Sequence, residues 1–178
     1  MSALPPWVDL PAFFPDPQHR VWLRRGLGSL LTADMGPAVF VLHNPSKASA
    51  DKDDATSRKG IAFARAWGAS DLVFVNAATG IATDADDLAL LDDPIGEMAD
   101  EALAVAARFC EDRGGKMIAA WGAPKGKAAT KRMMEARFEH VLGLRLPLHV
   151  LRVTPSGWPE HPLYLPGDLR PVPWERAS

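Results

Sequence analysis

The chain has little of several residue types, and each shortage excludes a class of protein. Its 178 residues include a single cysteine, which excludes an internal disulfide and a metal site built from cysteines. No apolar run approaches the ~18 residues that a membrane span needs. The N-terminus is interrupted by prolines and lacks the basic segment and apolar core of a secretory signal. We therefore expect a cytoplasmic protein without membrane partners.

Basic residues are missing from the middle of the chain. Residues 66–107 contain nine acidic residues and no lysine or arginine, whereas the rest carries 20 basic and 13 acidic residues. This asymmetry predicts one acidic and one basic face. The formal net charge of -2 argues against extended binding to duplex DNA, which depends on many phosphate contacts.

The pattern of apolar residues predicts an α/β fold. Apolar runs at 38–43, 72–76, 117–121 and 149–153 alternate with segments of helical periodicity at about 54–67, 94–113 and 127–142. The first three runs lack polar alternation, as strands buried on both faces of a parallel sheet do. We expect a Pro-rich N-terminal arm at 1–18 and a single α/β domain at 19–178. Its predicted core is an open sheet of about four parallel strands with flanking helices, and an edge strand is expected within 19–27.

Polar residues follow the ends of the predicted strands. In open parallel sheets the ligand crevice lies beyond the carboxyl ends of the strands. We expect the following residues at this edge: His43, Asn44, Asn76, Trp121, Gly122 and Thr154. A carboxamide at Asn44 could orient a water molecule or read a base edge. The alternative is a turn in which Asn44 bonds its own backbone before Pro45.

The start of the helix at 54–67 has two interpretations. Asp51, Asp53 and Asp54 could hold Mg²⁺, or they could cap the helix and complement its dipole. Thr56 and Arg58 lie in its first turn, where free amides suit a phosphate or carboxylate.

Two further segments carry candidate residues. Lys125, Lys127, Lys131 and Arg132 follow a strand end and form a basic rim for phosphate or nucleic-acid backbone, or simply a solvated helix face. The G-x-x-x-x-G-K-[ST] spacing of a phosphate-binding loop is missing. His161, in a proline-punctuated loop, could donate to a developing anion or could bond a backbone carbonyl.

The order of several motifs resembles the DUF1643 family. The motifs are LHNPSKA, DDATSRKGIAFARAWG, LVFVNA, AAWG and HPLYLP, and the resemblance covers about residues 21–165. The chain departs from the family pattern at His43, where an aliphatic residue is usual, and at Ala55, where proline is usual. The resemblance implies no established reaction.

A second resemblance is to the uracil-DNA glycosylase superfamily, and it implies a three-layer α/β/α fold. The matching order is Asn44-Pro45, Asn76, Trp121-Gly122 and His161-Pro162; Thr154-Pro155-Ser156 stands where the glycosylases have His-Pro-Ser. This resemblance implies two catalytic residues, Asn44 to hold the water and His161 to donate to the leaving base. It also implies that Asn76 reads the base and that Phe63 or Trp67 supplies an apolar wall.

Three functions follow from these observations. The leading hypothesis is a nucleobase- or nucleotide-binding crevice that hydrolyses an N-glycosidic bond in single-stranded or damaged DNA or in free nucleotides. The alternatives are a binding module without catalysis and a metal-assisted phosphoesterase. No cofactor is expected. The candidate ligand-binding residues are His43, Pro45, Ser46, Thr56, Arg58, Phe63, Asn76, Trp121, Gly122 and Tyr164.

Overall fold

Seven strands form one mixed sheet in the computed structural model, which describes residues 3–28, 35–46 and 48–176. Four strands run parallel in the centre, in the order β4 (Asp71–Asn76), β3 (Ala38–Leu42), β5 (Lys116–Ala119) and β6 (Leu148–Val150). Antiparallel strands extend both sides: β2 (Trp22–Gly26) and β1 (Ala12–Phe13) beyond β4, and β7 (Val172–Pro173) beyond β6. The sheet is larger than the expected four parallel strands and one edge strand, because β1 and β7, with two residues each, give almost no apolar signal.

The side chains of β3 and β4 alternate between the two faces of the sheet. Val39 and Val73 pack into one core cluster, and Phe40 and Phe74 pack into the other. All of the residues in β3 and β4 are buried. Both strands are therefore covered on both faces, as their continuous apolar runs predicted.

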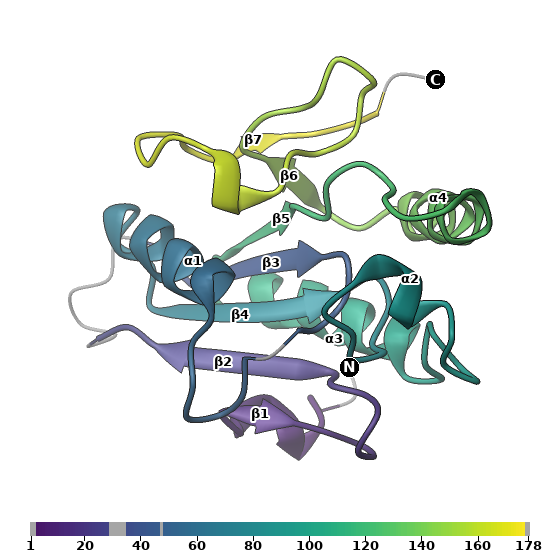
Figure 1. The fold of residues 1–178 in the computed structure, drawn as a ribbon. Coiled ribbons are helices and arrows are strands. Elements are labelled where there is room, and N and C mark those ends of the chain that lie inside the picture. The colour runs from purple at the N-terminus through teal and green to yellow at the C-terminus, as the bar shows by residue number, and fades with distance from the viewer. Residues whose placement is uncertain (1–2, 29–34, 47, 177–178) are drawn as a thin grey trace.

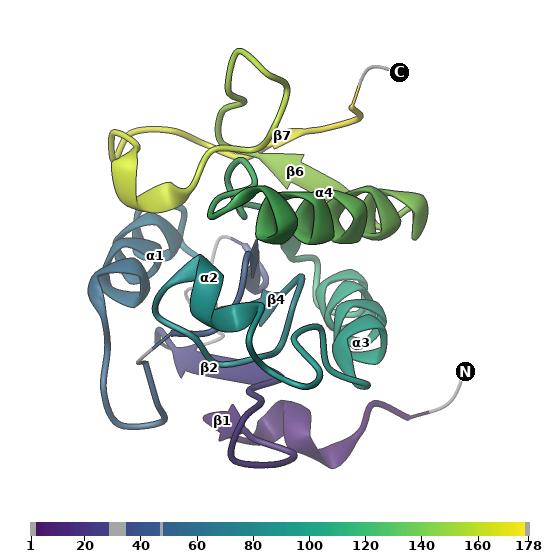
Figure 2. The same cartoon turned by 45° about the vertical axis from the view of Figure 1, so that its right-hand side comes forward.

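Helices cover the two faces of the sheet. The helix α1 (Ala55–Ala66) lies on one face, and α3 (Ala99–Glu111) and α4 (Ala128–Gly143) lie on the other (Figures 1 and 2). Asp54 caps α1 by accepting a hydrogen bond from the amide of Ser57, as the capping interpretation of this acidic segment predicted. The helix α4 also matches its predicted range closely.

The region before α3 differs from the prediction. The expected helix at 94–113 begins only at residue 99, because Gly96 adopts a left-handed φ of 85° that a regular helix excludes. A short helix that the sequence did not reveal, α2 (Ala85–Leu88), precedes it. The side chain of its residue Asp86 accepts a hydrogen bond from the amide of Lys127 at the start of α4.

The Pro-rich start of the chain, expected as a surface arm, contributes to the sheet and the core. It forms a short 3-10 helix, η1 (Pro6–Asp9), followed by β1, which pairs with β2. Trp7 stacks on Phe13 and meets Trp22 edge-on. The strand expected within 19–27 is β2, and it is an inner strand because β1 covers its outer edge.

The order of the strands creates a switch point between β3 and β5. The chain leaves β3 through α1 on one face, whereas it leaves the neighbouring strand β5 through α4 on the opposite face. Connections that diverge in this way leave a crevice beyond the carboxyl ends of the two strands.

Candidate functional site

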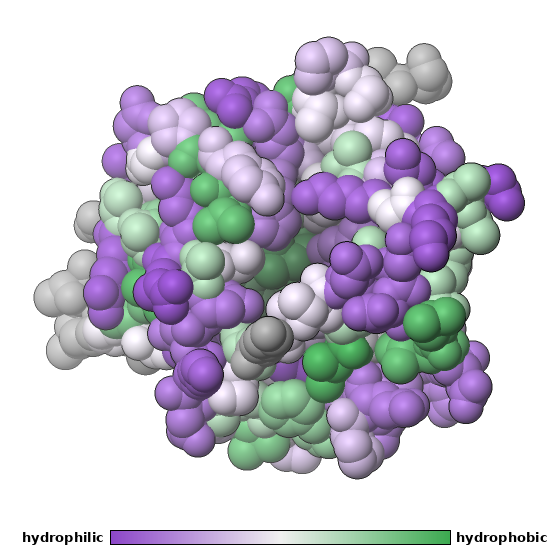
Figure 3. All heavy atoms as spheres, in the orientation of Figure 1, coloured by the Kyte–Doolittle hydropathy of each residue, from purple (hydrophilic) through white to green (hydrophobic). Residues whose placement is uncertain are grey.

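A cavity of about 250 Å³ lies at this switch point. Figure 3 shows a hollow with an apolar floor, ringed by hydrophilic side chains. Eight of the residues predicted from the sequence line the cavity: His43, Asn44, Ser46, Thr56, Trp121, Lys125, His161 and Tyr164. They come from four segments of the chain, so the expected convergence of strand ends brings these residues together.

Asn44 is held by backbone carbonyls. Its side-chain amide donates to the carbonyl of Pro45 at 2.9 Å and to that of Ala82 at 2.8 Å. Its Oδ1 accepts from His43 Nδ1 at 2.9 Å. Both amide hydrogens are therefore used internally, and a lone pair on Oδ1 is what remains for a ligand or water.

The bond to Asn44 fixes the tautomer of His43. Because an amide oxygen only accepts, Nδ1 of His43 carries the proton and Nε2 of the neutral ring is an acceptor. Burial, with a contribution from Lys125, lowers the pKa of His43. The ring packs edge-on against Phe138, with centroids 5.3 Å apart, so this position serves both the core and the cavity.

His161 offers a hydrogen-bond donor. Its Nδ1 accepts from the amide of Leu163 at 3.3 Å, so the proton of the neutral ring is on Nε2. Burial, reinforced by Lys125, lowers the pKa of His161 to about 4. It is therefore neutral at pH 7. The sequence could not say whether His161 reached the crevice; it lines the cavity at the start of the 3-10 helix η2 (Pro162–Tyr164).

The loop Thr154-Pro155-Ser156 does not contribute to the cavity. The Thr154 hydroxyl instead bonds Ser156 and accepts from the amide of Trp158, which closes a local turn. Of the two candidates for the histidine position of the glycosylases, His161 is thus the one at the site.

The rim carries a lysine and a tyrosine. Lys125 lies between β5 and α4, with its Nζ 5.6 Å from the ring centroid of Tyr164. Tyr164 is 70% exposed, so its ring offers a stacking surface at the mouth.

Several predicted residues lie outside the cavity. Phe63 is a core residue, 1% exposed and stacked on Trp67, and it forms no wall of the site. Arg58 is exposed and bonds the carbonyl of Asp53. Gly122 adopts a left-handed φ of 76° beside His161. The other residues that do not line the cavity are Pro45, Asn76, Lys127, Lys131 and Arg132.

Asn76 lies beside the cavity without lining it. It pairs in register with Leu42, which does line the cavity. The Asn76 side chain is fully buried, and neither its oxygen nor its nitrogen has a partner among the described residues. A buried carboxamide without partners is costly to the folded protein.

Three residues that line the cavity carry a buried nitrogen with no hydrogen-bond partner in the described part of the chain. They are Arg20 Nε, His43 Nε2 and Trp121 Nε1. Arg20 and Trp121 offer donors, whereas Nε2 of His43 is an acceptor.

Two of the three acidic residues before α1, Asp53 and Asp54, are already engaged. Asp53 forms an ion pair with Arg25 at 2.9 Å, and Asp54 accepts from the amide and the hydroxyl of Ser57. Of these acidic residues, Asp54 alone lines the cavity. Within the described ranges, no three His, Cys, Asp or Glu side chains are grouped to hold a metal ion. The helix-capping interpretation of this segment is therefore the one that fits.

Sequence reasoning missed seven lining residues: Arg20, Leu42, Asp54, Ser57, Phe74, Thr83 and Ala85. Arg20 precedes β2, which lies two strands away from β3 in the sheet, and nothing in its sequence neighbourhood indicates a site. Asp54 had been considered as a cap or metal ligand only. Thr83 belongs to the loop after β4 and Ala85 begins α2, and no pattern predicted the path of either.

A model of the family described as a protein of unknown function, DUF1643, matches residues 20–163. The chain belongs to the DUF1643 family. The match includes the whole parallel core and every residue that lines the cavity except Tyr164, which lies one residue beyond it. No curated protein and no solved structure matches the chain. No helix in the described part of this DUF1643 chain is long and apolar enough to cross a membrane.

Proposed function

We propose that the cavity binds a nucleobase or nucleotide and that the protein hydrolyses its N-glycosidic bond. The observation that carries the proposal is that two residues lining one cavity each hold a buried nitrogen without a partner in the described chain: a donor on Trp121 and an acceptor on His43. A nucleobase edge presents both acceptors and donors. Tyr164 at the mouth adds an exposed aromatic ring for stacking.

The reaction needs a positioned water and a donor to the leaving base. In the proposed step the water oxygen bonds the anomeric carbon, the C–N bond breaks, and its electron pair leaves with the base. The lone pair left on Asn44 Oδ1 holds the water, and Nε2–H of neutral His161 stabilises the developing negative charge on the base. The proton released from the water is then available to neutralise the base or pass to solvent.

The test is a base-release assay on the purified protein. The substrates are uracil-containing single- and double-stranded oligonucleotides and a panel of free nucleotides. We expect release from at least one substrate, and loss of release in His161→Ala and Asn44→Ala. His149→Ala is the matched control, because His149 lies in β6 and does not line the cavity. Release that survives His161→Ala would contradict the proposed role.

A second function, binding without catalysis, is favoured by the engagement of Asn44. Its amide is committed to the carbonyls of Pro45 and Ala82, so it has no hydrogen left to donate to a water or a base edge. Under this alternative the folded protein binds nucleobases or nucleotides but releases no base from any substrate. Calorimetric binding measured beside the release assay separates the two functions.

A further inference from the structure

Arg20 is a buried guanidinium at the cavity. It is 3% exposed, and its NH1 group donates to the carbonyl of Ala48. Its Nε, in contrast, has no partner within the residues that the structure describes. Burial lowers the pKa of Arg20 to about 10, so the group is still charged at neutral pH.

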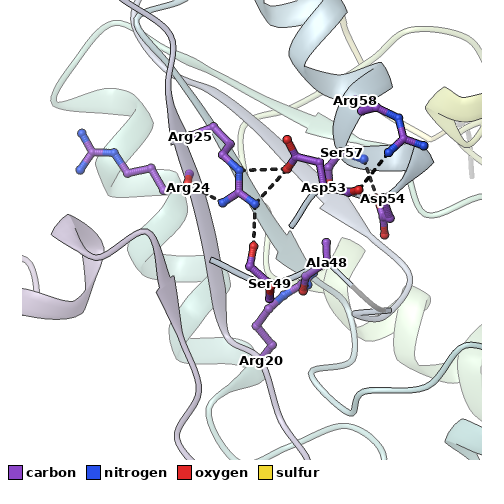
Figure 4. A network of polar contacts seen from close by, with 9 residues as sticks. All are labelled: Arg20, Arg24, Arg25, Ala48, Ser49, Asp53, Asp54, Ser57 and Arg58. Atoms are coloured by element: carbon purple, nitrogen blue, oxygen red, sulfur yellow. Dashed lines mark hydrogen bonds and ion pairs between the residues drawn. The ribbon is translucent and has the colours of Figure 1, made fainter. Parts of the chain in front are cut away.

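Two partly buried arginines of the neighbouring strand β2, Arg24 and Arg25, have carboxylate partners. Arg24 pairs with Asp71 at 2.8 Å, and Arg25 pairs with Asp53 at 2.9 Å. Figure 4 shows Arg25 bonded to Asp53 and Ser49, whereas Arg20 points to the Ala48 carbonyl. Among the described residues, Arg20 has no carboxylate within ion-pair distance. Asp54 acts on Arg20 only as a charge beyond ion-pair distance. A buried cation without an ion-pair partner is unfavourable, so this arrangement calls for an anion from outside the chain.

The surroundings of Arg20 favour an anion. Lys125 adds a second positive charge to the cavity lining, and the two lining histidines are neutral at pH 7. Asp54 is the opposing charge, but its Oδ1 accepts from the amide and hydroxyl of Ser57. The N-terminus of α1, at Thr56 and Ser57, also faces the cavity and carries the positive end of the helix dipole.

We propose that Arg20 binds a phosphate group of the ligand, so that the substrate class is a nucleotide or a nucleotide unit in a strand and not a free base or nucleoside. This inference rests on the proposed function, because it assigns the phosphate of the same ligand. The planar fork of a guanidinium binds two phosphate oxygens at once, and its free Nε–H supplies one of the donors for such a pair.

Calorimetry with three probes tests the inference: 5′-nucleoside monophosphates, the matching nucleosides and inorganic phosphate. We expect a monophosphate to bind about 30-fold or more tightly than its nucleoside, because the nucleoside leaves the buried charge unpaired. Arg20→Met should reduce monophosphate affinity to the nucleoside level and leave nucleoside affinity unchanged. Arg65→Met is the matched control, since Arg65 is an exposed residue of α1 that does not line the cavity.

Stability of the unliganded protein gives an independent readout. Because an uncompensated buried charge is removed, Arg20→Met should unfold at the same temperature as the wild type or higher. A variant that fails to fold would show that Arg20 stabilises the free protein, and would overturn the inference. Equal affinity for nucleoside and monophosphate, or unchanged affinity in Arg20→Met, would also overturn it.

The three probes also separate this inference from the proposed function. If inorganic phosphate binds through Arg20 and no nucleoside part adds affinity, the phosphate site stands and the nucleotide proposal fails. If nucleosides bind as tightly as monophosphates, the proposed function stands and the role of Arg20 fails. Competition between a single-stranded oligonucleotide and the monophosphate, with affinity for the oligonucleotide lost in Arg20→Met, would show that the phosphate belongs to a strand. If the oligonucleotide does not compete, the ligand is a free nucleotide.

Discussion

The side-chain amide of Asn44, at the end of β3, donates a hydrogen bond to the carbonyl of Ala82 at 2.8 Å. The backbone amide of Ala82 in turn donates to the carbonyl of Pro45. These two bonds tie the loop after β3 to the loop after β4, and both loops border the cavity. The shape of the cavity therefore depends on Asn44, which the sequence predicted as a catalytic residue.

Asn44→Ala should destabilise the protein as well as reduce activity. It leaves carbonyls at this junction without their donor, at a cost of about 1–3 kcal/mol in the free energy of unfolding. Urea denaturation measures the change. Ser46→Ala is the comparison, because Ser46 lines the same cavity but no hydrogen bond of its side chain is recorded in the described chain. An Asn44→Ala variant as stable as the wild type would mean that the two loops hold each other without this side chain.

Gly60 sets the distance between α1 and β4. A Cβ built on it would lie 2.6 Å from Cζ of Phe74, which lines the cavity. Gly60→Ala should therefore displace α1 or the ring and destabilise the protein by about 1–3 kcal/mol. Thermal unfolding followed by circular dichroism checks this.

Gly143 in α4 is the control for Gly60. A Cβ there meets no atom within 4 Å, so Gly143→Ala should stabilise the protein by about 0.5–1 kcal/mol through helix propensity. Equal effects of the two substitutions would contradict the close packing of α1 on β4.

His161 should make stability depend on pH between 6.5 and about 4. The ordinary pKa of a histidine side chain is 6.5, and the pKa of His161 in the folded protein is about 4, because burial disfavours the charged ring. The unfolded chain binds the extra proton in this range, so stability is full above pH 6.5 and is lost as the pH falls towards 4. In His161→Phe this loss should be absent. Urea denaturation of both proteins across the range measures it, and parallel curves would show that His161 is not buried as described.

The pH dependence of base release tests the protonation state of His161. Because neutral His161 is the proposed donor, base release should not respond to a titration of this residue near pH 6.5. A rate that falls with a midpoint near 6.5, in the wild type and not in His161→Gln, would contradict a neutral donor.

Asp86 should contribute to stability at neutral pH and lose this contribution in acid. The amide of Lys127 and the hydroxyl of Thr130 donate to its carboxylate, and both bonds lower the pKa of Asp86 from 3.8. A lowered pKa favours the ionised folded state, so the contribution is full above pH 3.8 and is lost as the pH falls through the folded pKa. The difference in melting temperature between wild type and Asp86→Asn should shrink as the pH is lowered through this range. A difference that stays constant would show that the charge of Asp86 is unimportant.

The amino-acid sequence by itself determined the parallel core and the helices α1 and α4. Val39 to Leu42 and Leu72 to Val75 are apolar without alternation, and such runs are stable only when both faces are covered. Asp54 determines the start of α1 through a bond three residues along the chain. The strand ends that carry Asn44 and Trp121 followed from these local patterns, and so did the place of the cavity.

The tertiary structure alone decided the rest. Asp86 reaches α4 across 41 residues of sequence, and Arg20 enters the cavity from a strand two positions away in the sheet. The short strands β1 and β7 exist because β2 and β6 offer them unpaired backbone groups, and not because of their own residues. Contacts of this kind depend on the path of the folded chain. Local periodicity and capping signals extend over only a few residues, and so they carry no information about such contacts.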